Sequence, residues 1–248
     1  MVRRIITNTY YYFKESRICG SLFYMYNKTL YMAKSNIEKT APKGSIKFSL
    51  TLSEEQKAAK QAILHHPYNF IVGKAGSGKT LLACQVALDM FFKRMVNKVI
   101  ITRPTVSTED NGFLPGSEKE KMEPWLVPIR SNMRKIYNKP ETLDRLEKDE
   151  SIELCSLAHF RGRTFENCIV IVDEFQNLTR SQFRMALGRL GKNSTMIFCG
   201  DNQQIDLKDT NYSAIHDVSK IADSDYVYKR VLEDNHRHEA IDDVFDRL

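Results

Sequence analysis

The sequence predicts an α/β fold, with a mainly parallel sheet flanked by helices in a single core domain. From residue 51 onward, short apolar runs rich in β-branched residues alternate with longer amphipathic segments, which is the pattern of a parallel sheet covered by helices. One apolar run leads into a glycine-rich loop, and two others end in acidic or amide residues. Because ligands bind at the carboxyl ends of parallel strands, we expect these three endings to form one site.

Each expected strand is a short apolar run. The runs are 69–72, 98–102, 152–155, 168–172, 195–199 and 226–231. Helices are expected between them. Ser53 and Gln56 form a capping box that opens a helix over 54–64, a second helix runs from Lys79 to about residue 94, and a third contains 181–190.

Residues 103–123 are expected to form a long loop. They combine Pro104, Gly112, Pro115 and Gly116 with many charged residues, and prolines and glycines of this kind interrupt regular structure. A loop of this length in a compact domain is more often functional than idle.

Residues 1–50 are expected to be a poorly ordered N-terminal extension, and residues 51–248 the core domain. Residues 1–31 hold six of the eleven tyrosines and a net charge of +4 out of the total of +6. They lack the continuous apolar region and the cleavage site of a secretory signal. A transit peptide is one interpretation; our preferred hypothesis is that Met32 is the native start, which an intact mass of the native protein would test.

Composition predicts a soluble, intracellular protein. Hydrophobic residues make up 42% of the chain and charged residues 27%, and no apolar run approaches the roughly 20 residues that span a bilayer. The five cysteines are widely spaced, without a Cys-x-x-Cys pair, so we expect reduced, buried thiols rather than a zinc site. Beyond residue 31 the net charge is only +2, which is weak support for a nucleic-acid partner.

The glycine-rich loop predicts a nucleotide-phosphate site. Gly73, Lys74, Ala75, Gly76, Ser77, Gly78, Lys79 and Thr80 match the spacing G-x-x-x-x-G-K-[ST] between a strand and a helix, and with Leu81 they are the expected nucleotide-binding residues. Backbone N–H groups and the helix N-terminus bind phosphate oxygens. Lys79 is expected to reach the β- and γ-phosphates of ATP, and the Thr80 hydroxyl to bind magnesium.

Two acids follow the apolar run 168–172. Asp173 is expected to hold magnesium, and Glu174 to orient or deprotonate the attacking water. The alternative is that both acids merely cap the following helix. After the run 195–199, Gln204 is a candidate sensor of the γ-phosphate, because an amide can hydrogen-bond the phosphate or its attacking water; the alternative is a simple turn.

These motifs resemble the first RecA-like domain of superfamily 1 helicases and, more closely, the PhoH-like family. The further matches cover about residues 52–240 in order, and are Thr102 to Pro104, Gly112 to Gly116, Arg161 to Thr164, Asp173 to Asn177, Gly200 to Leu207, and Arg237 with His238. Phe175 departs from the family pattern, where alanine is expected, and should pack rather than react. The resemblance implies a RecA-like P-loop ATPase acting in RNA or other nucleic-acid metabolism, in the cytoplasm of a bacterium or, if the protein is encoded by a phage, of the host cell.

The resemblance also implies roles for single residues. Gln56 would read the adenine edge, or else be a surface glutamine, and Arg237 would contact the γ-phosphate in cis or from a neighbouring subunit, or form a surface salt bridge. Arg103, Arg161 and Arg163 are candidates for holding a nucleic-acid backbone or positioning the nucleotide.

One aromatic residue with basic neighbours is a second candidate contact for nucleic acid. Trp125 lies near Arg130, Arg134 and Lys135, a combination that can stack bases and track phosphates. A core tryptophan beside a solvated basic face is the alternative that we favour.

The predicted function is magnesium-dependent ATP hydrolysis coupled to RNA or another nucleic acid, with RNA favoured over DNA. One alternative is a nucleotide-gated binding protein with little turnover. A helicase or translocase is another, active only as a homo-oligomer because one RecA-like domain is present. A small-molecule kinase should show an acceptor pocket and an arginine-rich lid, and no segment of that kind is evident.

Overall fold

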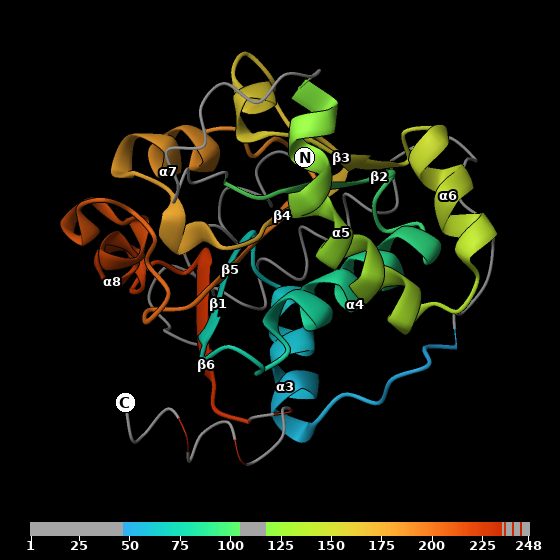
Figure 1. Ribbon diagram of the computed structural model, residues 1–248, viewed down its shortest axis with the longest axis horizontal. Coiled ribbons are helices and arrows are strands. Elements are labelled where there is room, and N and C mark those ends of the chain that lie inside the picture. Colours follow the sequence, from blue (N-terminus) through green and yellow to red (C-terminus); the bar gives the residue numbers. More distant parts are fainter. Residues whose placement is uncertain (1–46, 105–117, 235, 237–239, 241–243, 245–248) are drawn as a thin grey trace, which may run out of the picture. The chain divides into compact units, whose positions relative to one another are not determined.

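The computed structural model describes residues 47–104, 118–234, 236, 240 and 244, all within one compact unit, Ile37–Leu248 (Figure 1). Six strands form one sheet in the order β3-β2-β4-β5-β1-β6, and every neighbouring pair is parallel. The strands are β1 (Tyr68–Gly73), β2 (Lys98–Thr102), β3 (Ile152–Leu154), β4 (Cys168–Val172), β5 (Thr195–Gly200) and β6 (Val227–Leu232). The six predicted strands are all confirmed, with each end within one residue of the prediction.

The helices alternate with the strands. They are α3 (Glu54–Ile63), α4 (Lys79–Phe92), α5 (Glu118–Ile136), α6 (Pro140–Lys148), α7 (Arg180–Leu187) and α8 (Val218–Ile221). Single-turn 3₁₀ helices are η1 (Leu157–Phe160), η2 (Phe175–Asn177), η3 (Thr210–Tyr212) and η4 (Ala214–Asp217). The predicted capping box of Ser53 and Gln56 is present at the start of α3.

The core has two layers, one on each face of the sheet. In β4, Ile169 and Ile171 pack into one cluster of buried residues, while Val170 and Val172 pack into the other, because successive strand residues point to opposite faces. The first cluster includes residues of α3 to α6, and the second includes residues of α7 and α8. Figure 1 shows these two groups of helices on opposite sides of the sheet.

The prediction of a loop over 103–123 is wrong at its C-terminal end, because α5 already begins at Glu118. This helix contains two prolines, Pro124 and Pro128. Residues 105–117 lie outside the described residues. Each proline removes one backbone donor from the helix. The helix forms nonetheless because a stripe of apolar residues is buried against the core at helical spacing, and tertiary packing of this kind outweighs local preference. The stripe consists of Leu126, Ile129, Met133 and Ile136.

The predicted third helix is also shorter than expected. It ends at Leu187, because Arg189 and Gly191 bond to Phe165 instead of continuing the helix: the Phe165 amide donates to the Arg189 carbonyl at 2.8 Å, and the Gly191 amide donates to the Phe165 carbonyl at 2.8 Å. These contacts join the end of α7 to the segment before β4.

The described cysteines, Cys84, Cys155, Cys168 and Cys199, are free and buried, as predicted. Burial raises the pKa of the Cys155 thiol to about 12 and that of Cys168 to about 11. None of the helices in the described ranges combines the length and the apolar character needed to cross a membrane.

Candidate nucleotide site

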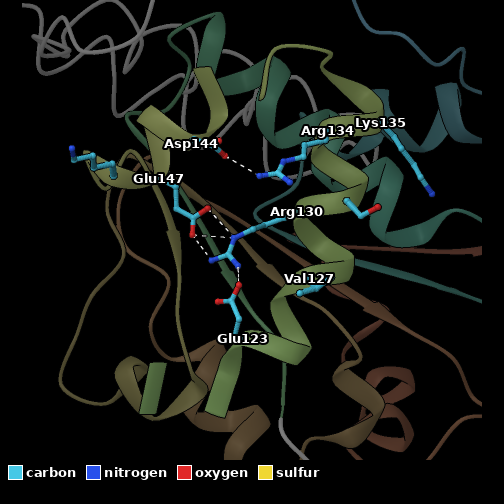
Figure 2. Close-up of a pocket in the computed structure, with 9 residues that line it drawn as sticks. Glu123, Val127, Arg130, Arg134, Lys135, Asp144 and Glu147 are labelled. Carbon is cyan, nitrogen blue, oxygen red and sulfur yellow. Dashed lines mark hydrogen bonds and ion pairs between the residues drawn. The ribbon is translucent and has the colours of Figure 1, made fainter. Parts of the chain in front are cut away.

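A cavity of about 850 Å³ lies between α5 and α6 and carries the basic residues singled out beside Trp125 (Figure 2). Arg130 bonds to Glu147, with its Nε 3.0 Å from Oε2, and also to Glu123. Arg134 donates to Asp144 at 3.1 Å. The predicted basic face is therefore largely neutralised by acids of the same two helices, which disfavours a nucleic-acid track in this groove.

A second cavity, of about 600 Å³, lies at the carboxyl edge of the sheet. Most of the predicted site residues line it, although they come from segments far apart in the chain: Gln56, Ala75, Gly76, Gly78, Lys79, Thr80, Leu81, Asp173, Glu174 and Gln204. Ser77 is buried within the loop, and Gly73 and Lys74 form its start. Arg237 lies outside the described residues.

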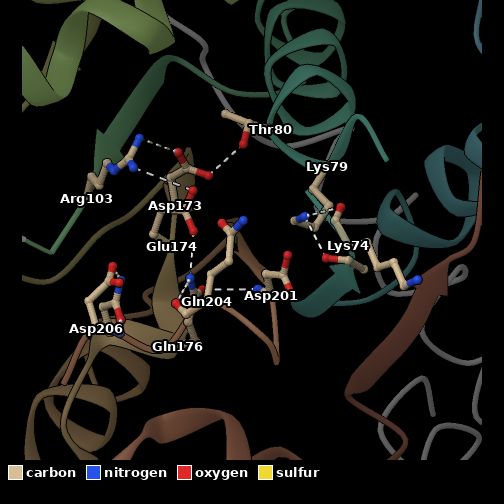
Figure 3. Close-up of polar contacts among 12 residues, drawn as sticks. Lys74, Lys79, Thr80, Arg103, Asp173, Glu174, Gln176, Asp201, Gln204 and Asp206 are labelled. Atoms are coloured by element: carbon tan, nitrogen blue, oxygen red, sulfur yellow. Dashed lines mark hydrogen bonds and ion pairs between the residues drawn. The ribbon is translucent and has the colours of Figure 1, made fainter. Parts of the chain in front are cut away.

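The phosphate loop connects β1 to α4 (Figure 3). Gly78 caps α4 in the left-handed conformation, with φ of 79°, and a Cβ at this position would lie 2.6 Å from Gln56 Nε2. Glycine meets both the backbone and the space requirement. Since α4 begins at Lys79, the unpaired N–H groups of its first turn lie at the loop, where an anion is favoured.

The Lys79 ammonium group is held by its own loop. Its Nζ donates to the carbonyl oxygens of Gly73 at 2.7 Å and Lys74 at 2.9 Å (Figure 3). The side chain is largely buried. These bonds orient a positive charge at the loop, next to the position where phosphate oxygens would lie.

The two acids after β4 differ in their surroundings. Asp173 is buried and accepts a hydrogen bond from the Thr80 hydroxyl at 2.7 Å. Burial raises the pKa of Asp173 and the neighbouring Glu174 charge raises it further, against the lowering effects of the Thr80 hydrogen bond, Arg103 and Lys79. Glu174 is partly exposed and has left-handed backbone angles, φ 52° and ψ 42°, which are uncommon outside glycine.

Arg103 faces both acids from the end of β2. Its guanidinium nitrogens lie 3.8 Å from Asp173 Oδ2 and 3.5 Å from Glu174 Oε1 (Figure 3). The same guanidinium lies 5.8 Å from the centre of the Trp125 ring, within the range of a cation–π contact. The structure therefore places Arg103 in the wall of the phosphate-loop cavity. It also places Trp125 against this arginine, half-buried rather than in the core.

Gln176 is a site residue that the sequence reasoning missed. It is fully buried; its Nε2 donates to Glu174 Oε2 at 2.7 Å and to the Gln204 carbonyl at 2.9 Å, and its Oε1 accepts from the Asp201 amide at 3.1 Å. One amide thus joins the end of β4 to the loop after β5. The signal in the sequence was its place in the run Asp173 to Asn177, which resembles the family pattern, but no role was predicted for this residue.

Phe175 packs, as predicted. It is fully buried against Phe70, Phe183 and Phe198. A Cβ at position 200 would lie 2.6 Å from the Phe175 ring. The ring therefore fits here because residue 200, at the end of β5, is a glycine.

Arg161 and Arg163 do not line the cavity. Arg163 forms a fork with Glu153, with contacts of 2.5 and 2.9 Å, and Lys98 lies 2.8 Å from the same carboxylate. The Arg163 hydrogen bonds, with Lys98, lower the pKa of Glu153 to about 2 despite its partial burial. Arg161 is exposed. The structure thus separates Arg161 and Arg163 from the phosphate-loop cavity.

Comparison with known proteins identifies relatives for most of the chain. The family model described as PhoH-like protein matches residues 50–247. A PhoH-like protein of Bacillus subtilis (strain 168) is 40% identical over 177 residues, covering 71% of this chain and 54% of the relative. A PhoH-like protein of Synechocystis sp. is 38% identical over 185 residues, covering 74% and 55%. The chain therefore spans slightly more than half the length of these curated relatives.

Solved structures agree on the fold. The large terminase from a thermophilic bacteriophage aligns with a TM-score of 0.50 at 10% identity, covering 80% of this chain and 50% of the terminase chain. The predicted RecA-like P-loop fold is confirmed. From its family match and from relatives at these identities, the chain belongs to the PhoH-like protein family.

Proposed function

We propose that this protein binds ATP with magnesium and hydrolyses it, and that hydrolysis is coupled to binding or remodelling of a nucleic acid, RNA in preference to DNA. The observation that carries the enzymatic half is the arrangement around one cavity: a phosphate loop with an oriented lysine, the partly buried Thr80–Asp173 pair, and Glu174 beside them. This set contains the parts that phosphoryl transfer to water requires.

Magnesium fits the donors present. The Thr80 hydroxyl and the Asp173 carboxylate are hard oxygen donors 2.7 Å apart, and magnesium is held by one or two such groups together with phosphate oxygens and water. A nearby cation would also offset the unfavourable burial of the Asp173 charge. When bound, the ion neutralises charge on the phosphates.

The remaining roles follow from contacts. Glu174 would orient the attacking water or take its proton, and Gln176 Nε2, 2.7 Å from Glu174 Oε2, would hold that carboxylate in place. Lys79 would stabilise charge on the β- and γ-phosphates. Gln204 lines the cavity, and its backbone carbonyl accepts a hydrogen bond from the same Gln176 amide group that contacts Glu174. Movement of Gln204 on loss of the γ-phosphate would therefore be transmitted through Gln176 to the Glu174 carboxylate.

The nucleic-acid half rests on the family resemblance. Its test is ATP turnover measured with single-stranded RNA, with single-stranded DNA and without a polymer. We expect the greatest stimulation by RNA. Stimulation by neither polymer would contradict this half and leave the ATPase half standing.

Turnover itself is tested with Glu174→Gln. The wild type should release phosphate and the variant should not, while both bind ATP. Equal, negligible release by both proteins would instead favour a nucleotide-gated binding protein. The helicase or translocase alternative requires a homo-oligomer. Light scattering with and without ATP tests it, and a protein that stays monomeric in both conditions would exclude this alternative.

A further inference from the structure

Gln56 is already fully occupied as a donor. Its Oε1 accepts from the Ser53 amide at 3.2 Å in the capping box, which fixes the orientation of the amide group. Its Nε2 donates to the Ser77 carbonyl at 3.2 Å and to His236 Nε2 at 3.1 Å. The side chain is buried. Both amide hydrogens are therefore used within the protein, and neither is available to a nucleobase without breaking one of these bonds.

His236 contacts Gln56 and lines the cavity beside it. Its backbone N–H donates to the Gly76 carbonyl at 3.2 Å, and its side chain lines the same cavity as Lys79 and Glu174. An amide nitrogen can only donate, so His236 Nε2 accepts from Gln56. The ring proton is then on Nδ1, which presents a donor of the kind that matches acceptor nitrogens of a nucleobase.

The segment leading to His236 is held by α3. Glu55, whose side chain is only 11% exposed, accepts from the backbone amides of Glu233 at 3.0 Å and Asp234 at 3.4 Å. It also accepts from Arg230 Nη2 at 3.2 Å. Two consecutive residues of α3 thus fix this segment: Glu55 holds the chain, and Gln56 holds the imidazole.

The strand order decides which part of a nucleotide His236 would meet. The phosphate loop follows β1, the acids follow β4 on one side of β1, and His236 follows β6 on the other side. A nucleotide with its terminal phosphate toward Glu174 and its phosphates on the loop has its base on the β6 side.

We infer that His236 is a nucleotide-binding residue whose imidazole recognises the base of the bound nucleoside triphosphate, with Gln56 and Glu55 as positioning residues. This rests on the proposed ATP binding and revises one part of it: the group predicted to read the base, Gln56, orients the group that does so. The Glu55 contact makes base recognition dependent on the segment after β6.

The test compares ATP with inorganic tripolyphosphate, which has the phosphates but no base. Affinities for both are measured by calorimetry on the full chain, with magnesium. His236→Ala should weaken ATP about tenfold, the value of one hydrogen bond, and leave tripolyphosphate unchanged. Lys79→Ala should weaken both. In turnover assays, His236→Ala should raise KM and leave kcat unchanged.

Variants of Glu55 test its role in positioning the segment that carries His236. Glu55→Ala should lower the ratio of ATP to tripolyphosphate affinity about threefold, which is less than the loss in His236→Ala because Glu55 acts only through the position of the segment. Glu55→Gln, which keeps an acceptor oxygen, should retain most of the ratio. Glu54→Ala is the matched control, because Glu54 is adjacent but 90% exposed and contacts Lys57.

Two outcomes overturn the inference. In the first, His236→Ala changes both affinities by the same factor; in the second, it changes neither. A wild-type protein that binds neither ligand would instead refute the proposed ATP binding itself, so the two failures are distinguishable.

Discussion

The α5–α6 groove and the phosphate-loop cavity are both lined by charged side chains, yet their charges are arranged differently. In the groove, Arg130 contacts Glu147 at 2.5 to 3.2 Å and also contacts Glu123. At the phosphate loop, Asp173 and Glu174 are adjacent like charges, and Arg103 stays 3.5 to 3.8 Å from them. In the groove of about 850 Å³ both arginines are paired with acids, whereas the cavity of about 600 Å³ leaves charges for a ligand.

This difference teaches that cavity size is a poor guide to function here. Opposite charges that already form short pairs gain little by binding a further ion. Like charges held together by the fold raise the free energy of the empty site, and a ligand of opposite charge relieves it.

The largest expected effect separates two glutamates. Glu174→Gln should lower ATP turnover by about 10²–10⁴-fold, the usual contribution of a general base, with ATP binding retained. Glu147→Gln is the matched change in the groove and should leave turnover within about twofold, because Glu147 contacts Arg130 rather than the site. Steady-state phosphate release measures both, and similar losses would erase the contrast between the cavities.

A metal titration examines the Thr80–Asp173 pair. Thr80→Val removes the hydroxyl that donates to Asp173 at 2.7 Å. The magnesium concentration for half-maximal turnover should rise about tenfold, as for the loss of one oxygen ligand contact of about 1.4 kcal/mol. Thr80→Ser should behave like the wild type, and Ser131→Ala, which alters the groove, is the control. An unchanged magnesium requirement in Thr80→Val would exclude Thr80 as a ligand.

The free energy of unfolding should depend on the charges in the groove rather than on those in the phosphate-loop cavity. Arg130→Met leaves Glu147 and Glu123 without their shared partner, which should lower the free energy of unfolding by about 1–2 kcal/mol. ATP affinity should not change. The double variant with Glu147→Met should recover part of the loss. Urea denaturation checks this, and an undiminished midpoint in Arg130→Met would mean that the groove charges are not coupled.

The smallest effect concerns a closed charge cluster outside both cavities. Arg163 and Lys98 hold the pKa of Glu153 near 2, below its usual 4.5. A depressed carboxyl pKa stabilises the folded protein above about pH 4.5, and this contribution disappears as the pH falls toward 2. Because the cluster is partly exposed, Glu153→Gln should cost about 1 kcal/mol at pH 7 and less than half of that at pH 3. Denaturation at the two pH values is the measurement; an equal cost at both would show that the charge is not responsible.

The strands and the phosphate loop were predictable because their signals are local. The alternation of side chains in β4 and the short apolar runs determine which residues pack on each face. The spacing of Gly73, Gly78 and Lys79 specifies a loop that joins a strand to a helix. The parallel arrangement then places Asp173 and Glu174 at the same edge as that loop.

Other features depended on partners far away in the chain. The predicted loop over 103–123 overlaps the start of α5, because the apolar stripe of this helix packs against the core. Arg130 was predicted to belong to a basic face, but in the structure its charge is paired with Glu147 of α6. Gln56 looked free to bind a base until His236, 180 residues later, accepted its hydrogen bond.

The sequence by itself therefore determined the sheet, the phosphate loop and the acids that follow β4, since backbone preference and side-chain periodicity act over a few residues. Only the tertiary structure decided which of the charged and amide side chains are already paired and which face a ligand. The physical reason is that a hydrogen bond or an ion pair depends on the distance between two atoms, and for residues such as Gln56, Arg103 and Gln176 that distance is determined by the packing of the whole domain.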